Sequence, residues 1–185
     1  MNFGIKLAIG ILLLSLLLGV SCFAMVNGTY NTCIAHEAQI EAQYKQNQNN
    51  YDNMFKKILE VSQVTDKYAK DLKELFDNTM KGRYGKDGSK AMFQFLKEHN
   101  PTLDTQVYTK LQNIIASGRT DFMNEQKMLL DKKQAYDIYR KQLTTAIVSG
   151  MMGFPKIDLK SMDIVTSDET EAAFKTKKAA PLKLN

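Results

Sequence analysis

An unbroken apolar run near the N-terminus constrains this chain more than any other feature. Between Leu7 and Val26 nearly every residue is apolar, and the exceptions are Ser15, Ser21 and Cys22. A helix of about 20 residues rises about 30 Å, which matches the hydrocarbon thickness of a bilayer, and it satisfies its own backbone hydrogen bonds. The run therefore predicts a single transmembrane helix, retained as a signal-anchor, whose partner is the lipid bilayer.

Two other interpretations fit the same segment. The short basic start and the small residues near Ser21 to Ala24 also suit a secretory signal with a cleavage site. The run from Leu18 to Cys22 places a cysteine after a small residue, where a lipoprotein carries its lipid. Under all three interpretations the rest of the chain is delivered to a membrane or held at one.

Basic residues beside the run predict its orientation. Lys6 precedes the run, and no Lys or Arg follows it until Lys45. The positive-inside tendency then places the N-terminus in the cytoplasm and the body outside or in the periplasm.

The rest of the composition favours helices. The chain has only 3 Pro and no Trp and is rich in Leu, Met, Lys and Gln, which are good helix formers. We predict an all-α fold, with the N-terminal transmembrane helix followed by an elongated antiparallel helical bundle. The predicted domains are an anchor at residues 1–28, a helical bundle at 29–155 and an irregular basic tail at 156–185.

Periodicity predicts the helices of this bundle. The clearest amphipathic segment is Tyr51 to Met80, and the glycine-rich segment Lys81 to Ser89 is predicted to be the main loop. A short helix, Ala91 to Glu98, ends before Asn100-Pro101. A long helix is predicted from Leu103 to Gly150, since apolar residues recur there every seven positions, at Ile115, Phe122, Leu129, Tyr136 and Leu143.

Two polar stretches leave alternatives open. Asn27-Gly28-Thr29 is either a joint after the anchor or part of a helix that runs straight on. The amide-rich run Gln46 to Asn50 is either a break or the wet face of a long helix. At the other end, Gly150 to Pro155 closes the bundle.

Several short motifs resemble the LemA family. They are Tyr30-Asn31 at the start of the first body helix, Tyr51-Asp52 at the next helical stretch and Phe154-Pro155 at the end of the bundle. Pro101 with Leu103 and the stretch Gln126, Lys132 to Asp137 resemble the loop and the last long helix of that family. The chain is similar to a divergent member, of the kind that a phage or a small genome carries, and the resemblance implies a membrane-tethered helical bundle.

The chain departs from the family pattern at several places. Asn49-Asn50 stand where the family has paired arginines, and Asn53 to Lys57 replace its Leu-Ile-Pro-Asn-Leu. The spacing from Tyr136 to Phe154 is also longer than in the family, and the loop Gly82 to Gly88 is unlike its usual connection. The resemblance therefore predicts architecture more than activity.

The sequence shows no pattern of a catalytic, cofactor or metal site. His36 and His99 lack a second ligand at zinc spacing, and Cys33 beside His36 lacks the orienting group of a nucleophilic pair. The net charge of +5 comes from 25 basic and 20 acidic residues that alternate along the chain, so no nucleic-acid partner is predicted.

The predicted function is a non-catalytic, membrane-tethered scaffold or adaptor that presents a helical surface to a protein partner or to a second copy. An aromatic patch involving Tyr44, Tyr51 and Tyr139 is the expected contact surface. The alternatives are a subunit associated with an envelope enzyme, which needs a pocket with perturbed titratable groups, and a membrane-perturbing assembly or lysis factor.

Overall fold

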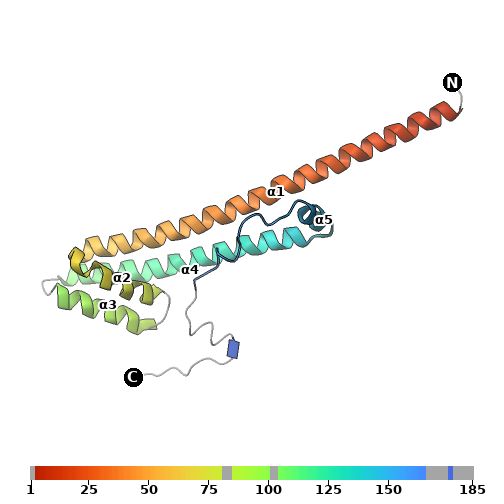
Figure 1. The fold of residues 1–185 in the computed structure, drawn as a ribbon. Helices are drawn as coiled ribbons and strands as arrows, with labels where there is room; N and C mark the ends of the chain where they lie inside the picture. The colour runs from red at the N-terminus through yellow and green to blue at the C-terminus, as the bar shows by residue number, and fades with distance from the viewer. Residues whose placement is uncertain (1–2, 81–84, 101–103, 166–174, 177–185) are drawn as a thin grey trace. The chain divides into compact units, whose positions relative to one another are not determined.

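The computed structural model describes residues 3–80, 85–100, 104–165 and 175–176, and this part of the chain is predominantly helical (Figure 1). Its helices are α1 (Phe3–Ser62), α2 (Asp66–Met80), α3 (Gly85–His99), α4 (Thr105–Lys141) and α5 (Leu143–Met151), and the described residues form no strand. The prediction of an all-α fold, with a long apolar N-terminal helix followed by further helices, is confirmed.

The chain packs as two compact units. Unit 1 comprises Met1–Ala42 and Asp131–Met162, and unit 2 comprises Gln43–Leu130 and Asp163–Asn185. Helices α1 and α4 each contribute residues to both units. This division follows packing and does not test the predicted domain boundaries at residues 28 and 155, which stay predictions.

Both of the polar stretches left open above are helical and lie within α1. At Gly28 the backbone carbonyl accepts a hydrogen bond from Thr32 Oγ1 at 2.8 Å. In the amide-rich run, Gln46 Nε2 donates to Asn50 Oδ1 at 2.9 Å, one turn further on. Side chains four residues apart on a helix face each other, so amide pairs support the helix that their low propensity disfavours.

Helix α1 ends earlier than the sequence predicts, so the prediction of one helix from Tyr51 to Met80 is wrong. Gln63 takes a left-handed conformation with φ of 51°, and its N–H donates to Leu59 O at 3.1 Å. This is a helix stop of the kind usually formed by glycine. The Asn100 amide donates to Ser62 O at 3.2 Å and so satisfies a carbonyl at the helix end.

The predicted loop Lys81 to Ser89 is wrong in its second half, because α3 begins at Gly85; residues 81–84 lie outside the described residues. The predicted helix Ala91 to Glu98 lies within α3.

The predicted single helix Leu103 to Gly150 is also wrong. Leu103 lies outside the described residues, and α4 ends at Lys141 because Gln142 is extended, with φ −65° and ψ 144°. The Thr145 hydroxyl donates to the carbonyls of Tyr139 and Gln142 and so satisfies acceptors that the interrupted helix leaves open. Leu143, predicted to lie in the seven-residue seam, follows this break and is exposed, whereas Ile115, Leu129 and Tyr136 are buried and Phe122 is half-buried.

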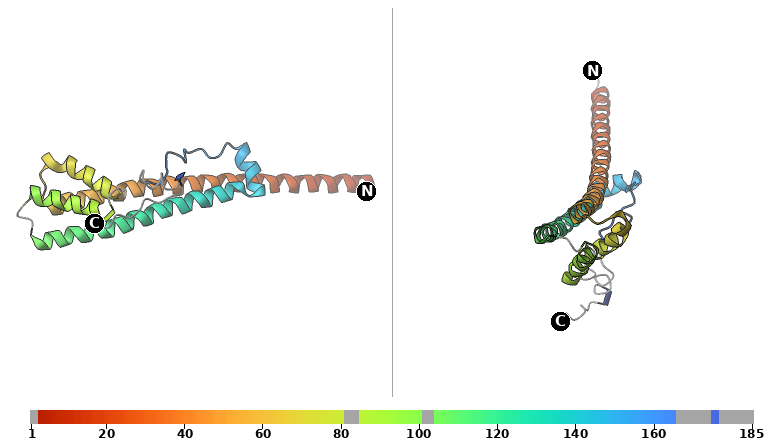
Figure 2. Two further views of the ribbon diagram at one scale, coloured as in Figure 1. Left: turned by 90° about the horizontal axis from the view of Figure 1, so that it is seen from below. Right: turned by 90° about the vertical axis from the view of Figure 1, so that its left-hand side faces the viewer.

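Unit 2 has an apolar core to which every one of its helices contributes. Asn47 and Asn50 of α1 bond to Glu125 of α4, while Met54, further along α1, meets Gly118 of α4, so these two helices are antiparallel here. Helices α2 and α3 pack side by side (Figure 2). The buried core residues are Met54, Ile58, Leu72, Phe76, Met80, Met92, Phe93, Leu96, Leu111 and Ile115.

Candidate functional site

The N-terminal part of α1 lies in unit 1 and exposes its apolar side chains. Within the described residues α1 is the one helix long and apolar enough to cross a membrane, and none of its most apolar 18-residue window is buried. The exposed large side chains from Leu7 to Val20 are Leu7, Ile9, Ile11, Leu12, Leu13, Leu14, Leu16, Leu17, Leu18 and Val20. The helix is therefore able to span a bilayer. Its retention, its orientation and lipid attachment at Cys22 stay predictions.

A buried polar cluster joins α1 and α4 within unit 1. The Glu37 carboxylate is almost fully buried, and its Oε1 accepts a hydrogen bond from the Tyr136 hydroxyl at 2.6 Å. The same oxygen accepts the backbone N–H of Lys156 at 2.8 Å. A buried carboxylate needs such donors, because its desolvation would otherwise be very costly. Glu37 thus joins three segments far apart in the sequence.

Titratable groups beside Glu37 are held in their protonated forms. Burial raises the pKa of the Tyr136 phenol, and the hydrogen bond to Glu37 raises it further. Burial also raises the pKa of the Cys33 thiol, with a smaller upward contribution from the Glu37 charge. A cysteine nucleophile needs a lowered pKa, so Cys33 has the environment of a structural thiol and not of a reactive one.

His36 packs on the same cluster. Its ring lies 5.5 Å from that of Tyr136 and 5.4 Å from that of Tyr139, centroid to centroid. His99 lies in α3, with its ring 4.2 Å from that of Tyr68. Among the described side chains, no group of three or more His, Cys, Asp or Glu is placed to hold a metal ion.

A glycine-based helix stop at the end of α5 turns the chain so that the Lys156 N–H reaches Glu37. Gly153 has φ of 71°, its N–H donates to Gly150 O at 3.2 Å, and the N–H of Phe154 donates to Ser149 O at 3.0 Å. This pair of bonds is the Schellman motif, and glycine is favoured at its left-handed position. The motif turns the chain so that Phe154 and the residues after it fold back onto α1.

The returning segment packs on Tyr30 of α1. The rings of Phe154 and Tyr30 meet edge to face at 5.6 Å. Lys156 Nζ lies 4.6 Å from the Tyr30 ring centroid and donates to the Tyr30 hydroxyl at 3.3 Å. Arg140 lies over the Tyr136 ring and donates to Phe154 O at 3.4 Å. Tyr30, Tyr136 and Phe154 thus gather in one cluster within unit 1.

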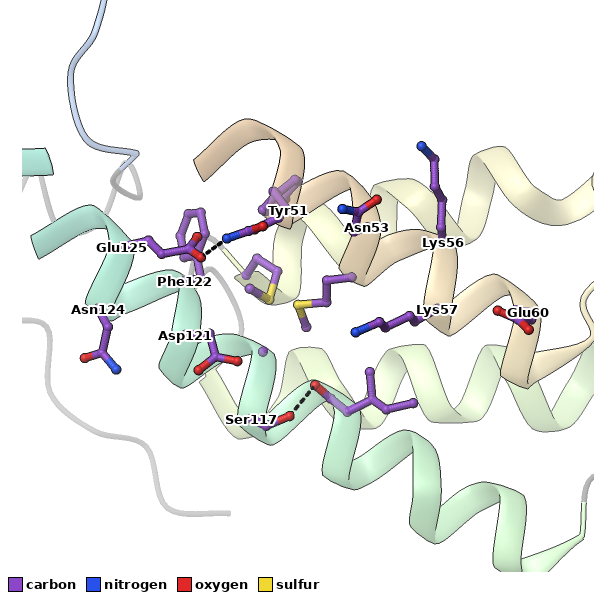
Figure 3. Close-up of a pocket in the computed structure, with 15 residues that line it drawn as sticks. Tyr51, Asn53, Lys56, Lys57, Glu60, Ser117, Asp121, Phe122, Asn124 and Glu125 are labelled. Carbon is purple, nitrogen blue, oxygen red and sulfur yellow. Dashed lines mark hydrogen bonds between the residues drawn. The ribbon is translucent and has the colours of Figure 1, made fainter. Parts of the chain in front are cut away.

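Unit 2 contains a polar groove between α1 and α4, with a volume of about 590 Å³ (Figure 3). Lys56, Lys57 and Glu60 line it from α1, and Asp121 and Glu125 line it from α4. Gly118 allows close approach at its floor, since a Cβ there would lie 2.2 Å from Met54 Sδ. The groove therefore offers both signs of charge above an apolar floor.

A second hollow in unit 2 has a volume of about 650 Å³ and an aromatic wall formed by Tyr44, Tyr51 and Phe122. The Tyr51 hydroxyl donates to Asp77 Oδ1 at 2.7 Å. Burial is the larger cause of the raised pKa of Tyr51, and this hydrogen bond raises the pKa further. Lys73 Nζ reaches the same carboxylate oxygen at 2.9 Å. Tyr51 is thus a fixed, protonated part of the wall.

The predicted aromatic patch is brought together only in part. Tyr44 and Tyr51 line the second hollow, whereas Tyr139 belongs to unit 1 and packs on His36. Phe122, which the sequence placed in a core seam, takes the third place in the aromatic wall. Residues 82–84 of the predicted loop and most of the basic end of the tail lie outside the described residues.

Sequence reasoning did not assign a role to Glu37 or to its contacts with Tyr136 and Lys156. Cys33, Glu37 and Ile40 follow one another at the three-to-four spacing of a single helix stripe, and all three are buried. An acidic residue inside such a stripe is the signal of a buried polar contact, but the stripe does not identify the donor.

No protein-family model, curated protein or solved structure matches this chain.

Proposed function

We propose that the chain is a membrane-tethered helical scaffold of LemA type, without catalytic activity, that holds a protein partner or a second copy at the cell envelope. The observation that carries this proposal is the exposed apolar stretch from Leu7 to Val26, which continues as one helix into the packed residues that follow it. Exposed leucine and isoleucine over the length of a bilayer are stable in lipid and unfavourable in water.

The proposed topology places the N-terminus in the cytoplasm and the body outside or in the periplasm. Lys6 on one side of the span and the absence of basic residues from Leu7 to Tyr44 on the other support it. The proposed tether is retained in the mature chain.

The aromatic hollow of unit 2 is the proposed contact surface for the partner. Tyr44, Tyr51 and Phe122 combine apolar area with few rotatable bonds, which suits protein contacts. Gln48 and Asn49, which are exposed and line the same hollow, supply amide groups for polar contacts around these rings.

The tether is tested by alkaline carbonate extraction of the full chain and of a variant lacking residues 1–26, each with a compartment reporter after Asn185. We expect the full chain to stay with the membrane, with its reporter on the non-cytoplasmic side, and the shortened chain to become extractable. A mature chain that begins near Phe23 and is released would contradict the tether.

The contact surface is tested by a photo-crosslinking amino acid at Tyr44 and, as the matched control, at Met123. Met123 is exposed on α4 of the same unit and lines neither hollow. We expect a discrete crosslinked product from position 44 and none from position 123. Equal labelling at both positions would contradict a specific surface at the hollow.

A further inference from the structure

Helix α5 buries its polar side and exposes its apolar side. Leu143, Ile147 and Met151, at i, i+4 and i+8, are 85%, 62% and 82% exposed. The opposite side holds Thr145, Val148 and Ser149, all buried. A helix on the surface of a water-soluble domain has the reverse arrangement, so the exposed stripe of α5 suits an apolar medium.

The hydroxyls on the buried side make this arrangement stable. Thr145 Oγ1 donates to backbone carbonyls of Tyr139 and Gln142, and Ser149 Oγ donates to Ala146 O at 3.3 Å. Because these groups are satisfied locally, the polar side can pack against unit 1 without unpaired donors.

The position of α5 places the stripe at the height where α1 would leave a bilayer. The segment that follows α5 packs through Phe154 on Tyr30 of α1. Tyr30 stands four residues after Val26, the end of the apolar run, which is about 6 Å along a helix at 1.5 Å per residue. This height falls in the headgroup layer of a bilayer whose hydrocarbon core contains Leu7 to Val26.

The side chains around this contact are those found at membrane surfaces. Tyr30 supplies a half-buried aromatic ring, and Lys156 carries an exposed ammonium group 4.6 Å from the centroid of that ring. Aromatic rings and long basic side chains gather at the headgroup level because each combines an apolar body with a polar or charged end.

The direction of α5 also fits a membrane surface. In both views of Figure 2, α5 lies beside the part of α1 that belongs to unit 1 and runs across its direction. A helix that lies across a membrane-spanning helix is parallel to the membrane plane.

We propose that α5 is an interfacial helix that inserts Leu143, Ile147 and Met151 into the phospholipid boundary of the membrane that α1 crosses. This inference rests on the proposed tether and adds to it a second membrane contact, supplied by residues 117 or more positions later in the chain than Val26. With two contacts, one across the bilayer and one along its surface, unit 1 has a fixed tilt and rotation relative to the membrane.

The test is depth-dependent fluorescence quenching of the full chain in phosphatidylcholine vesicles. An environment-sensitive thiol probe is placed at Ile147→Cys in a Cys22→Ala background, where buried Cys33 is the other cysteine and the background chain alone is the blank. The quencher is a phospholipid with a nitroxide near the top of its acyl chain. Native Cys22, exposed on the apolar run, carries the probe that reports on the tether itself.

The matched control is Ala135→Cys, which is exposed on α4 of the same unit, next to the residue that contacts Glu37. Glu37 stands 11 residues past Val26, which is about 16 Å along α1 and beyond the headgroup layer. We expect the nitroxide lipid to reduce the Ile147 fluorescence about twofold or more and to leave the Ala135 fluorescence unchanged.

Quenching at Cys22 without quenching at Ile147 would overturn the interfacial role of α5 and leave the tether intact. Absence of quenching at Cys22 would remove the tether and the premise of this inference with it. Protection of the Ile147 probe from aqueous iodide, but only at high protein-to-lipid ratio, would assign the stripe to a second copy and overturn the lipid contact.

A second variant separates lipid contact from simple proximity. Leu143→Asn with Met151→Asn removes apolar area from exposed positions, so the helix content measured by circular dichroism should not change. We expect the Ile147 probe in this variant to lose most of its quenching. Unchanged quenching would show that the stripe does not hold α5 at the lipid, which contradicts the proposal.

Discussion

Units 1 and 2 both pack residues of α1 against residues of α4, but they do so by different means. In unit 2 the packed surface is an apolar core built around Ile58, Phe76 and Leu111. In unit 1 the central contact is the hydrogen bond between buried Glu37 and Tyr136. Burial of apolar side chains stabilises a helix pair strongly and is non-directional, so it is compatible with several relative placements of the two helices. A buried hydrogen-bond network destabilises the fold unless each donor and acceptor meets its partner.

This difference assigns different roles to the two kinds of packing. The core of unit 2 supplies most of the free energy of its own folding. The network of unit 1 selects one placement of the segment from Gly153 to Lys156, which apolar contacts alone would leave free to slide. We expect core substitutions in unit 2 to lower the free energy of unfolding most. Substitutions in the network of unit 1 should change the position of the segment from Gly153 to Lys156 as well as the free energy of unfolding.

The largest effect is expected for Phe76→Ala in unit 2. The Phe76 ring is fully buried and lies 5.0 Å from the Tyr51 ring and 5.4 Å from the Phe55 ring. Removing a buried phenyl ring costs about 3–5 kcal/mol of unfolding free energy. Urea denaturation of the full chain in detergent micelles, followed by circular dichroism, measures this loss.

The control for that substitution is Met123→Ala, whose side chain is 69% exposed. It should change the unfolding free energy by no more than about 0.5 kcal/mol. Equal losses for the two variants would mean that the apolar cluster is not the main source of stability in unit 2.

A smaller effect with a positional consequence is expected for Glu37→Ala in unit 1. The Tyr136 hydroxyl and the Lys156 N–H lose their acceptor, at a cost of about 1–3 kcal/mol for a buried group left unpaired. Hydrogen exchange should show faster exchange at the Lys156 amide. Glu37→Gln keeps an acceptor oxygen, so its Lys156 amide should exchange at a rate between those of the native chain and the alanine variant. An unchanged exchange rate at the Lys156 amide in the alanine variant would show that the network does not hold this segment in place.

A loss of stability at alkaline pH is expected in both units, because each contains a tyrosine with a raised pKa: half-buried Tyr51 in unit 2 and buried Tyr136 in unit 1. The unfolded chain loses the phenol proton above its ordinary pKa of 10.0, while the folded chain keeps it. Stability is therefore fully present below pH 10 and falls above it, by about 1.4 kcal/mol per pH unit for each tyrosine.

Matched variants assign this loss to each unit. Tyr136→Phe should remove the alkaline step from peptides of unit 1 in hydrogen exchange at pH 9 to 11, and Tyr51→Phe should remove it from those of unit 2. An alkaline step that survives in unit 1 of the Tyr136→Phe chain would assign the titration to another group.

The smallest effect is expected for Lys141→Ala at the end of α4. Lys141 Nζ lies 2.5 Å from Asp137 Oδ2, but the lysine side chain is 74% exposed. An exposed pair of this kind contributes about 0.5 kcal/mol or less. The hydrogen bond from Lys141 is the main cause of the lowered pKa of Asp137. The contribution of this pair to stability is therefore present above the ordinary pKa of 3.8 and disappears as the pH falls through the pKa of Asp137 in the folded chain.

NMR titration of the Asp137 carboxyl measures that pair directly. The Lys141→Ala chain should show a higher Asp137 pKa with almost unchanged stability. A stability loss as large as that of Glu37→Ala would mean that exposed ion pairs, and not the buried network, hold unit 1.

Local patterns predicted the helices and much of the core but not the places where the helices end. Ile58, Leu72 and Phe76 are apolar positions of the predicted amphipathic segment Tyr51 to Met80, and all three are buried. The stop at Gln63 was missed, since a residue other than glycine takes the left-handed conformation there. The break at Gln142 was missed too, because nothing in the period of apolar residues changes on passing from α4 to α5.

For the candidate sites too, the sequence predicted some of the residues and missed how they are brought together. Tyr44 and Tyr51 were expected at a contact surface and do line one hollow. Phe122 was expected in the core seam; it packs against the core and also completes the wall of that hollow. Tyr139 carries the same side chain as Tyr44 and lies in the other unit. Residue type alone does not distinguish them, since the helix face that each tyrosine occupies depends on how the helices pack.

The sequence by itself determined that this chain is helical and that it begins with an apolar helix able to cross a bilayer, because both properties follow from composition and periodicity within one segment. Only the tertiary structure decided that Glu37 meets Tyr136 and Lys156, and that α5 exposes its apolar side. Those features depend on contacts between residues as far apart as 119 positions, and local propensity carries no information about such pairs.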